Sequence, residues 1–304
     1  MNKKNLFYAL NFAVAAVLIY LLVSSFDVNQ VIQQVKTIPV EVFLLAGLLY
    51  AVANAIGVYR LNYFMPSVGF FQFLRIHFTS MFFSDLTPGR VGYSYLVLAL
   101  RKKGVKASQS AKFAAVMLFS DFFARSVFLF STVWLFAADF SIAAGFLLLA
   151  SICFLGVFFY KVEVFSKFLG WLPLIGKKAR VFYDDFFTYA VKKTDVVFSI
   201  IISFIAAVPR GAAWLIVLNA VTGSSFELLP LVVLTAVVTA LSFIPVSIAG
   251  LGVQEGVGAF ALSSLLGISL IHAAAALLLV RLIELSTDAF FALIHFILSK
   301  SKLF

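Results

Sequence analysis

Apolar residues are gathered along this chain into long runs that polar residues rarely interrupt. A helix needs about 20 apolar residues to cross a hydrocarbon core about 30 Å thick. Runs of that length occupy residues 6–26, 40–59, 113–138, 140–160, 196–218 and 273–298. The pattern therefore predicts six transmembrane helices. The first run lacks a small-residue cleavage pattern, so we expect it to be a retained span and not a signal peptide.

Two other apolar regions are interrupted. Residues 70–83 and 93–100 are each too short to cross alone, and residues 228–266 are broken by Pro245 and a cluster of glycines. Such breaks occur at membrane depth where protein or water satisfies the backbone, as in the re-entrant segments of transporters. We expect an all-α integral membrane protein, a single polytopic domain over residues 1–304. It would have about six full transmembrane helices plus two re-entrant broken-helix hairpins.

The composition excludes a soluble protein. Of the 304 residues, 63% are apolar and 12% are charged, and so few charges cannot cover a water-exposed surface of this size. The net charge of +10 indicates cytoplasmic loops that face anionic lipid, and not a nucleic-acid partner. Cys153 is the single cysteine of the sequence, so an intrachain disulfide is excluded.

Basic residues indicate which helix ends face the cytoplasm. They gather at residues 3–4, 101–112, 161–193 and 300–302, with seven Lys or Arg in the third segment, whereas the loops of the opposite side carry only Lys36. By the positive-inside rule we expect a multi-pass protein of the cell membrane with both termini cytoplasmic. The third segment mixes aromatic residues with lysine, so we expect interfacial helices on the inner leaflet.

The two hairpins enter from opposite sides in this orientation. Residues 70–138 hold the first hairpin plus a charged helix, and residues 228–298 hold the second hairpin plus a charged helix. A Gly-Val turn at 104–105 and a Gly-Ile turn at 267–268 join each hairpin to its helix. This order indicates inverted repeats, by which many transporters build a midplane site. Coincidence of hydropathy stays open as an explanation, because few residues are identical between the halves.

The segment FIPVSIAGLGVQEG at residues 243–256 interrupts an apolar region with a proline, glycines and a carboxylate. We expect Gly250 and Gly252 to expose backbone N–H groups at the start of the next helix, where phosphate is attracted. Glu255 is a candidate for releasing the bound anion. Gly252 and Gly256 also form a GxxxG pair, so close helix packing is the alternative interpretation.

The segment DLTPGRVG at residues 85–92 forms the tip of the first hairpin. Pro88, Gly89 and Gly92 are expected to shape this tip. Arg90 would then be held within the membrane as the first candidate for binding an anionic headgroup. An ordinary Pro-Gly turn in a cytoplasmic loop is the alternative.

Charged residues also lie inside the predicted spans. Asp121 and Arg125 are four residues apart. Arg281 is followed by Glu284 three residues later and by Asp288 four residues after that. Each set therefore shares a helix face. Such charges are costly in lipid and usually face the protein interior. Arginine suits phosphate, while ion pairing that only holds the bundle together stays open. The substrate-binding candidates are Arg90, Arg125, Arg281, Gly250, Gly252, Glu255, Asp121 and Arg210, and the structural hairpin residues are Pro88, Gly89, Gly92, Pro245 and Gly256. The histidines show no metal-ligand spacing, so no metal or cofactor is expected.

Both hairpin motifs resemble those of a known membrane family. FIPVSIAGLGVQEG resembles the P-x-S-x-x-G-L-G-x-x-E-G signature of the flippase-like family that includes the transmembrane region of lysylphosphatidylglycerol synthase. LTPGRVG, followed by the basic patch RKKGVKAS, is similar to that family's Pro-Gly-Arg-x-Gly motif and its cytoplasmic turn. Tyr93 stands where the family commonly has glutamate. Matched by position, the resemblance implies roles for Pro245, Gly250, Gly252, Glu255, Pro88, Arg90, Gly92, Arg125 and Arg281.

The resemblance implies the membrane region alone, which in relatives is associated with moving lipid between leaflets. We do not expect these 304 residues to synthesise an aminoacyl lipid. We expect a transporter and not an enzyme, which moves an anionic phospholipid or a polyprenyl-phosphate-linked lipid. Its partner is then a membrane lipid with a phosphate headgroup. Two alternatives stay open: a non-transporting partner subunit, with homo-oligomers also allowed, and an intramembrane lipid-phosphate transferase.

Overall fold

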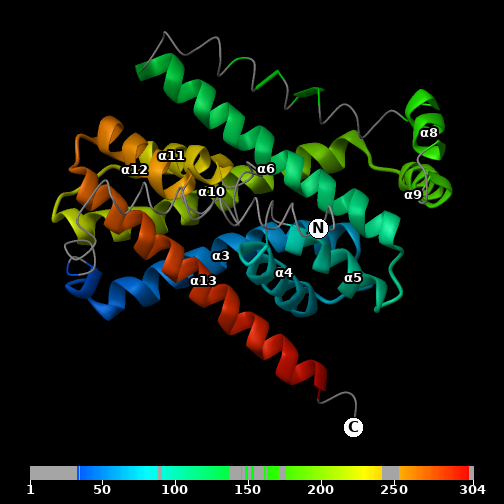
Figure 1. The fold of residues 1–304 in the computed structure, drawn as a ribbon, viewed down its shortest axis with the longest axis horizontal. Helices are drawn as coiled ribbons and strands as arrows, with labels where there is room; N and C mark the ends of the chain where they lie inside the picture. The colour runs from blue at the N-terminus through cyan, green and yellow to red at the C-terminus, as the bar shows by residue number, and fades with distance from the viewer. Residues whose placement is uncertain are drawn as a thin grey trace, which may run out of the picture. The chain divides into compact units, whose positions relative to one another are not determined.

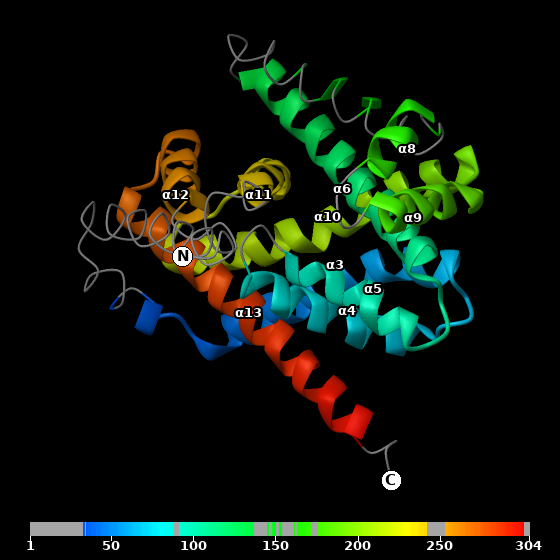
Figure 2. The same ribbon diagram turned by 45° about the vertical axis from the view of Figure 1, so that its right-hand side comes forward.

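The computed structural model describes residues 33, 35–87, 91–136, 145, 148–149, 152–153, 161, 163–171, 176–241 and 253–300. These residues form ten α-helices and one short 3-10 helix, and no strand is found among them (Figures 1 and 2). The predicted all-α fold is confirmed. The helices are α3 (Val40–Phe64), α4 (Phe70–Asp85), η1 (Val91–Ser94), α5 (Tyr95–Arg101), α6 (Ala107–Phe136), α8 (Glu163–Gly170), α9 (Gly176–Thr188), α10 (Lys193–Thr222), α11 (Leu228–Leu241), α12 (Val253–Leu266) and α13 (Leu270–Lys300).

Three of the described helices are long and apolar enough to cross a membrane: α3, the part Ala107–Ser131 of α6, and α10. They coincide with three of the predicted spans. Helix α13, with 31 residues, is about 46 Å long and carries Arg281, Glu284 and Asp288 along its length. The predicted span at 6–26 lies outside the described residues. Of the predicted span at 140–160, the structure describes five residues. The full six-span arrangement stays a prediction.

The long helices extend beyond the apolar runs that predict them. The apolar run marks only the part suited to lipid, whereas helical hydrogen bonding continues into polar flanking residues. At the start of α10, for example, the carboxylate of Asp195 accepts a hydrogen bond from the N–H of Lys192 at 2.9 Å. This contact gives the N–H of Lys192 an acceptor at the start of the helix.

Short helices occur where the hairpins are predicted. Helix α4 has 16 residues, and α11 and α12 have 14 each, so their lengths of about 24 and 21 Å fall short of a hydrocarbon core of about 30 Å. A break containing η1 separates α4 from α5. The second break, at residues 242–252, lies outside the described residues. The short limbs are confirmed, and their re-entrant path stays a prediction.

Two glycines end short helices in the left-handed backbone conformation. Gly104 has a φ of 83° and Gly267 a φ of 67°, which suits glycine because it has no Cβ. Ser269 then caps α13, since its hydroxyl accepts a hydrogen bond from the N–H of His272 at 3.2 Å. The predicted Gly-Val and Gly-Ile turns are therefore confirmed.

The chain divides into two compact units, and each has its own core. The first unit is drawn from Met1–Ala55, Leu74–Tyr95 and Ala206–Phe304, and the second from Ile56–Phe73 and Leu96–Ile205. In the first, Trp214, Leu218, Leu231, Leu262 and the alanines 273–276 are buried together. Helix α12 packs along the first half of α13 in both views (Figures 1 and 2), and the small alanine side chains permit that close approach.

The second core consists largely of aromatic residues around two buried valines. Val116 and Val196 pack with Phe64, Phe119 and Phe123, among other residues. The ring of Phe64 also stacks on that of Phe113 with 4.9 Å between centroids, an arrangement that adds to the burial of apolar area. This core fixes the positions of α3, α6 and α10 around the polar network described below.

Candidate functional site

Polar side chains of the first unit gather around Tyr50 of α3. The Tyr50 hydroxyl lies 3.2 and 3.3 Å from the two carboxylate oxygens of Asp288 on α13 and donates to that group. The guanidinium of Arg210 lies over the Tyr50 ring, 5.7 Å from its centroid. Asp288 is fully buried, and a carboxylate is tolerated in such a place only with hydrogen-bonding partners. Tyr50 therefore connects a buried acid to a cation.

A second contact ties α13 to the end of α4. Nη2 of Arg281 lies 3.6 Å from Oδ1 of Asp85, and these side chains are 12% and 4% exposed. Glu284, one turn along from Arg281, is also buried. The predicted shared face of Arg281, Glu284 and Asp288 is confirmed, because all three lie on one continuous helix at spacings of three and four.

A small cavity lies beside Tyr50. Its volume is about 10 Å³, which is room for about one water molecule. Tyr50, Arg210, Trp214 and Glu284 line it together with apolar residues. Trp214 is 1% exposed, and its Nε1–H has no hydrogen-bond partner among the described residues. An indole donor, a guanidinium and a carboxylate thus surround a water-sized space.

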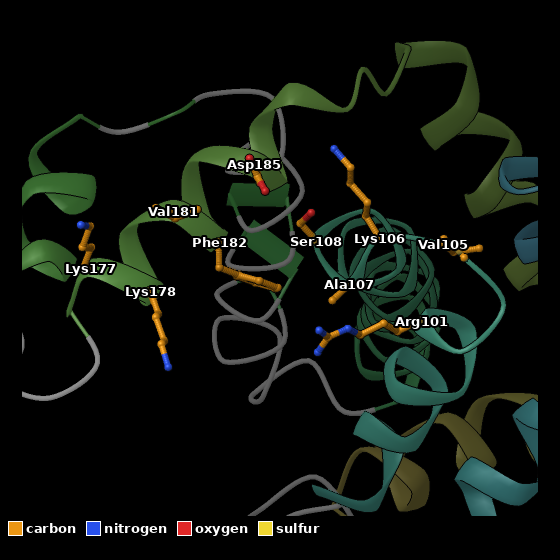
Figure 3. Close-up of a pocket in the computed structure, with 11 residues that line it drawn as sticks. Arg101, Val105, Lys106, Ala107, Ser108, Lys177, Lys178, Val181, Phe182 and Asp185 are labelled. Carbon is orange, nitrogen blue, oxygen red and sulfur yellow. The ribbon is translucent and has the colours of Figure 1, made fainter.

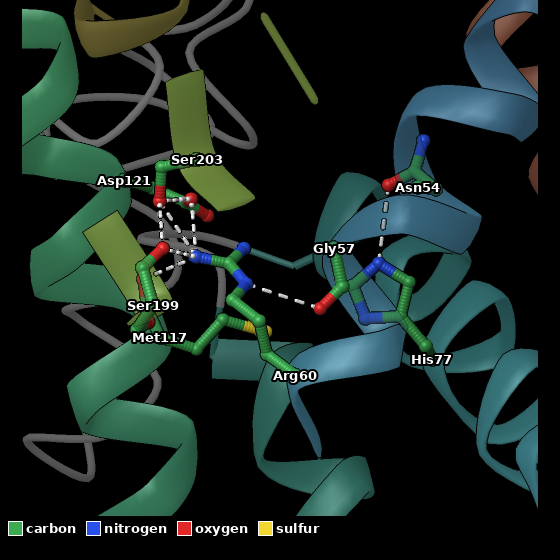
Figure 4. A network of polar contacts seen from close by, with 8 residues as sticks. All are labelled: Asn54, Gly57, Arg60, His77, Met117, Asp121, Ser199 and Ser203. Atoms are coloured by element: carbon green, nitrogen blue, oxygen red, sulfur yellow. Dashed lines mark hydrogen bonds and ion pairs between the residues drawn. The ribbon is translucent and has the colours of Figure 1, made fainter. Parts of the chain in front are cut away.

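The cluster continues along α3 through Asn54. Its amide nitrogen donates to the carbonyl of Tyr50 at 2.9 Å, and its amide oxygen lies 3.1 Å from Nε2 of His77 (Figure 4). Since the amide oxygen is an acceptor, His77 carries its proton on Nε2 in this pair. His77 therefore has a structural partner, and it belongs to a hydrogen-bonded series that leads to Tyr50.

We expect Tyr50→Phe to lower the free energy of unfolding by about 1–3 kcal/mol, the usual result when a buried charged group loses a hydrogen-bond donor. The ring under Arg210 is retained, so the effect reports on the hydroxyl contact with Asp288. Tyr63→Phe is the matched control, because the Tyr63 hydroxyl reaches Asp195 at 3.4 Å in an exposed position. Denaturant unfolding of the purified protein in detergent measures both. Equal stability of the two variants would contradict the assignment.

The second unit contains a separate buried network around Arg60 of α3 (Figure 4). Nη1 of Arg60 lies 2.8 Å from Oδ1 of Asp121 and 2.7 Å from the hydroxyl of Ser203. It also donates to the carbonyl of Ser199 at 3.3 Å, and Nε donates to the carbonyl of Gly57 at 3.1 Å. Arg60 is 2% exposed. Such a dense set of acceptors is what a buried guanidinium requires.

Asp121 is accordingly held from more than one side. Besides Arg60, the hydroxyl of Ser203 donates to its Oδ1 at 2.7 Å. Arg125, one turn along α6 and half-buried, acts on Asp121 through its charge. The close ion pair of Asp121 is therefore with Arg60, a residue distant in sequence, and its i,i+4 neighbour contributes at longer range.

The two polar clusters occur at matching places in the order of helices. Asp121 lies seventeen residues after Gly104, and Glu284 lies seventeen residues after Gly267. Each acid meets an arginine from the long helix that precedes a short-helix segment: Arg60 of α3 pairs with Asp121, and Arg210 of α10 lines the same cavity as Glu284. The correspondence supports an internal repeat, while its inversion stays a prediction.

A comparison with known families decides what kind of chain carries these clusters. The model of the lysylphosphatidylglycerol synthase TM region matches residues 8–290. The chain belongs to this family. No curated protein matches it. Membership in the lysylphosphatidylglycerol synthase TM family makes this a membrane protein, in agreement with its apolar helices, and confirms the resemblance drawn from the two motifs.

The motif residues of this lysylphosphatidylglycerol synthase TM domain are only partly described by the structure. Gly92 lies in η1 against the end of α4, and Gly256 lies in α12. Glu255 is in the backbone of α12, but its side chain is outside the described part. The remaining predicted motif residues lie outside the described residues, namely Pro88, Gly89, Arg90, Pro245, Gly250 and Gly252. Their proposed roles stay predictions.

The structure brings together Arg210 and Arg281 with acids of the first unit, and Arg125 with Asp121 in the second. The sequence analysis missed Arg60, because the predicted span at residues 40–59 ends one residue before it. A charge inside a long helix is itself a signal of a polar site, and a longer window would have included it. Tyr50 and Trp214 carry no comparable signal, since aromatic residues in such helices are usually packing or interface residues.

Proposed function

We propose that this protein transports a phosphate-bearing lipid between the leaflets of the membrane without changing it covalently. The lipid is an anionic phospholipid or a polyprenyl-phosphate-linked lipid, and the chain is multi-pass with both termini cytoplasmic. Family membership supports a role with membrane lipid. The apolar faces of α3, α10 and α13, where Leu44, Ile201 and Phe290 are about half or more exposed, suit contact with lipid.

The observation that carries the proposal is the contact of Arg281 with Asp85. Both charges are largely buried and 3.6 Å apart, at the place where α4 ends and the first break begins. Ionisable residues in such apolar helices are costly and mark transport pathways more often than surface sites. Arginine also presents a fork of donors that matches a phosphate. Arg281 is therefore the primary phosphate ligand of the proposed path.

Exchange of partners explains how Arg281 binds and releases lipid. The cavity beside Tyr50, with a volume of about 10 Å³, is far too small for a headgroup, so the helices must separate to admit one. In that open state a phosphate replaces Asp85 as the partner of Arg281. On closure the carboxylates of Asp85 and Glu284 compete for the guanidinium and displace the lipid. The acyl or prenyl chains stay in the bilayer throughout.

Liposomes test this proposal directly. We expect the purified chain to move fluorescent phosphatidylglycerol between leaflets faster than protein-free vesicles do, and the lipid to be recovered unchanged by mass spectrometry. Arg281→Gln is expected to slow this movement by about tenfold or more, since loss of one charge-assisted hydrogen bond is worth that much. Leaflet exchange is followed by quenching the outer dye with dithionite.

Arg180→Gln is the matched control, because this arginine of α9 is about half exposed and its contact with Asp184 is long, at 3.7 Å. Its variant should move lipid at the rate of the unmodified protein. Movement no faster than in empty vesicles would refute transport. Full activity of Arg281→Gln in correctly folded protein would refute the role of Arg281, and a lipid product of altered mass would indicate a transferase instead.

A further inference from the structure

An open pocket of about 720 Å³ lies in the second unit, between α9 and the turn that joins α5 to α6. Arg101, Lys106, Lys177 and Lys178 contribute cations to its wall, and Asp185 is the acid that lines it. The lining residues therefore carry more positive than negative charge. It predicts an anionic occupant.

The cations do not all point the same way. Figure 3 shows the guanidinium of Arg101 and the ring of Phe182 directed into the space between α9 and the turn. Lys178 extends from the opposite wall on the same side as Arg101, whereas Lys106 and Lys177 project away from that space. Arg101 therefore faces the pocket as drawn, and Lys178 can reach the same space from the α9 wall by a change of rotamer. Lys106 and Lys177 point out of the pocket.

The start of α6 adds backbone donors to the same place. Ala107 and Ser108, its first two residues, both line the pocket. The first hydrogen bond at this end runs from the N–H of Ser110 to the carbonyl of Lys106 at 3.0 Å, so the N–H groups before it have no acceptor within the helix. Phosphate is attracted to such an end, and here it would meet Arg101 as well.

Both walls are held in place by contacts away from the pocket. Buried Lys112 of α6 lies over the ring of Phe187 of α9, 4.9 Å from its centroid. Asp184 of α9 accepts hydrogen bonds from Lys161 and Ser166, each at 2.9 Å. The Lys161 contact, with that of Ser166, lowers the pKa of the Asp184 carboxyl, so the contact is present at neutral pH and is lost only as the pH falls through that lowered value.

Apolar side chains beside the pocket favour a lipid over a soluble anion. Val181 and Phe182 line it and are 53% and 43% exposed. Exposed aromatic and aliphatic residues next to lysines are typical of helices that lie at a membrane surface. A soluble phosphate has no use for this apolar rim, whereas the glycerol and upper chains of a lipid can cover it.

We propose that this pocket binds the phosphate of an anionic glycerophospholipid headgroup in the inner leaflet, between Arg101 and Lys178. The proposal does not rest on lipid transport, because a headgroup can bind here whether or not the chain moves lipid. The site collects anionic lipid at the membrane surface next to the start of α6. Ser108 and the first N–H groups of α6 complete the contacts to the phosphate.

Two charge-matched variants test the site in the full chain. Arg101→Gln with Lys178→Gln removes the arginine that faces the pocket and the lysine on the opposite wall, and Lys106→Gln with Lys177→Gln removes two cations that project away. Native mass spectrometry measures the retention of added phosphatidylglycerol and phosphatidylcholine by the detergent-purified protein. We expect the first pair to weaken phosphatidylglycerol binding by about tenfold, the usual value of a charge-assisted hydrogen bond to phosphate, and the second pair to change it less than about twofold. All four side chains are exposed, so folding should be unaffected.

Four outcomes would overturn the proposal. Equal losses of phosphatidylglycerol binding in both double variants would indicate attraction by general surface charge. No loss of binding in the Arg101→Gln, Lys178→Gln variant would mean that the pocket is not the site. Phosphatidylcholine retained as strongly as phosphatidylglycerol would refute an anionic headgroup. Glycerol 3-phosphate is added as a competitor, and displacement of the lipid at equal concentration would identify a soluble ligand. A protein that binds here and moves no lipid would refute only transport.

Discussion

Arg60→Ala is expected to lower the free energy of unfolding by about 3 kcal/mol, the lower end of the range found when one partner of a buried ion pair is removed, because the Asp121 side chain left behind is 29% exposed. Arg60 is 2% exposed and supplies the cation 2.8 Å from Asp121. Without it, the carboxylate keeps only the Ser203 hydroxyl as a close partner on Oδ1, and the carbonyls of Ser199 and Gly57 lose a donor. Denaturant unfolding in detergent measures the loss.

Two further variants show that the loss comes from the unpaired charge. Arg60→Met combined with Asp121→Leu removes both partners and fills their volume, so it should recover most of the stability. Arg180→Ala removes an arginine from an exposed pair and should change the free energy of unfolding by about 0.5 kcal/mol or less. An Arg60→Ala protein as stable as the Arg180→Ala protein would disprove the structural role of this network.

The positions of the helices could be predicted from the sequence, because apolar runs and glycine turns are local signals. The runs at 40–59 and 196–218 lie within α3 and α10, and Gly104 and Gly267 have the expected left-handed conformation. Helix ends were less accurate, since caps such as Asp195 extend the helix past the apolar run. Two short helices, α8 and α9, occur in the segment where interfacial helices are expected, and their position at the inner leaflet stays a prediction.

The partners of the charged residues could not be predicted in the same way. Spacing of four places Arg125 beside Asp121 on one helix face, yet the ion pair at 2.8 Å joins Asp121 to Arg60. That choice depends on how α3 packs against α6 and α10 in the second core, which no single helix pattern contains. The pairing of Asp85 with Arg281 is likewise a tertiary contact, so the sequence indicated several of the charges inside the helices but not which of them meet.

Gly92 connects the first break to this charged cluster. A Cβ at Gly92 would collide with the carbonyl of Phe83 and the amide nitrogen of Ser84, which are backbone atoms of α4. Its N–H donates to the hydroxyl of Thr87 at 2.7 Å. The chain that returns from the break therefore lies directly on the end of α4, one residue from Asp85. Only glycine permits so close an approach of two backbone segments, which gives a physical reason for glycine at this position of the motif.

Gly92→Ala is therefore expected to destabilise the protein by about 3 kcal/mol, the upper part of the range for overpacking, because rigid backbone and not a flexible side chain must yield. The displacement would also move Asp85 relative to Arg281, so lipid movement in liposomes should fall with stability. Gly69→Ala is the control at the other end of α4, where an added Cβ meets no atom within 4 Å. Because glycine is preferred to alanine at the N-cap of a helix, it should cost about 1 kcal/mol. Thermal unfolding and the liposome assay measure both variants. Equal behaviour of the two would mean that the close approach at Gly92 does not position Asp85.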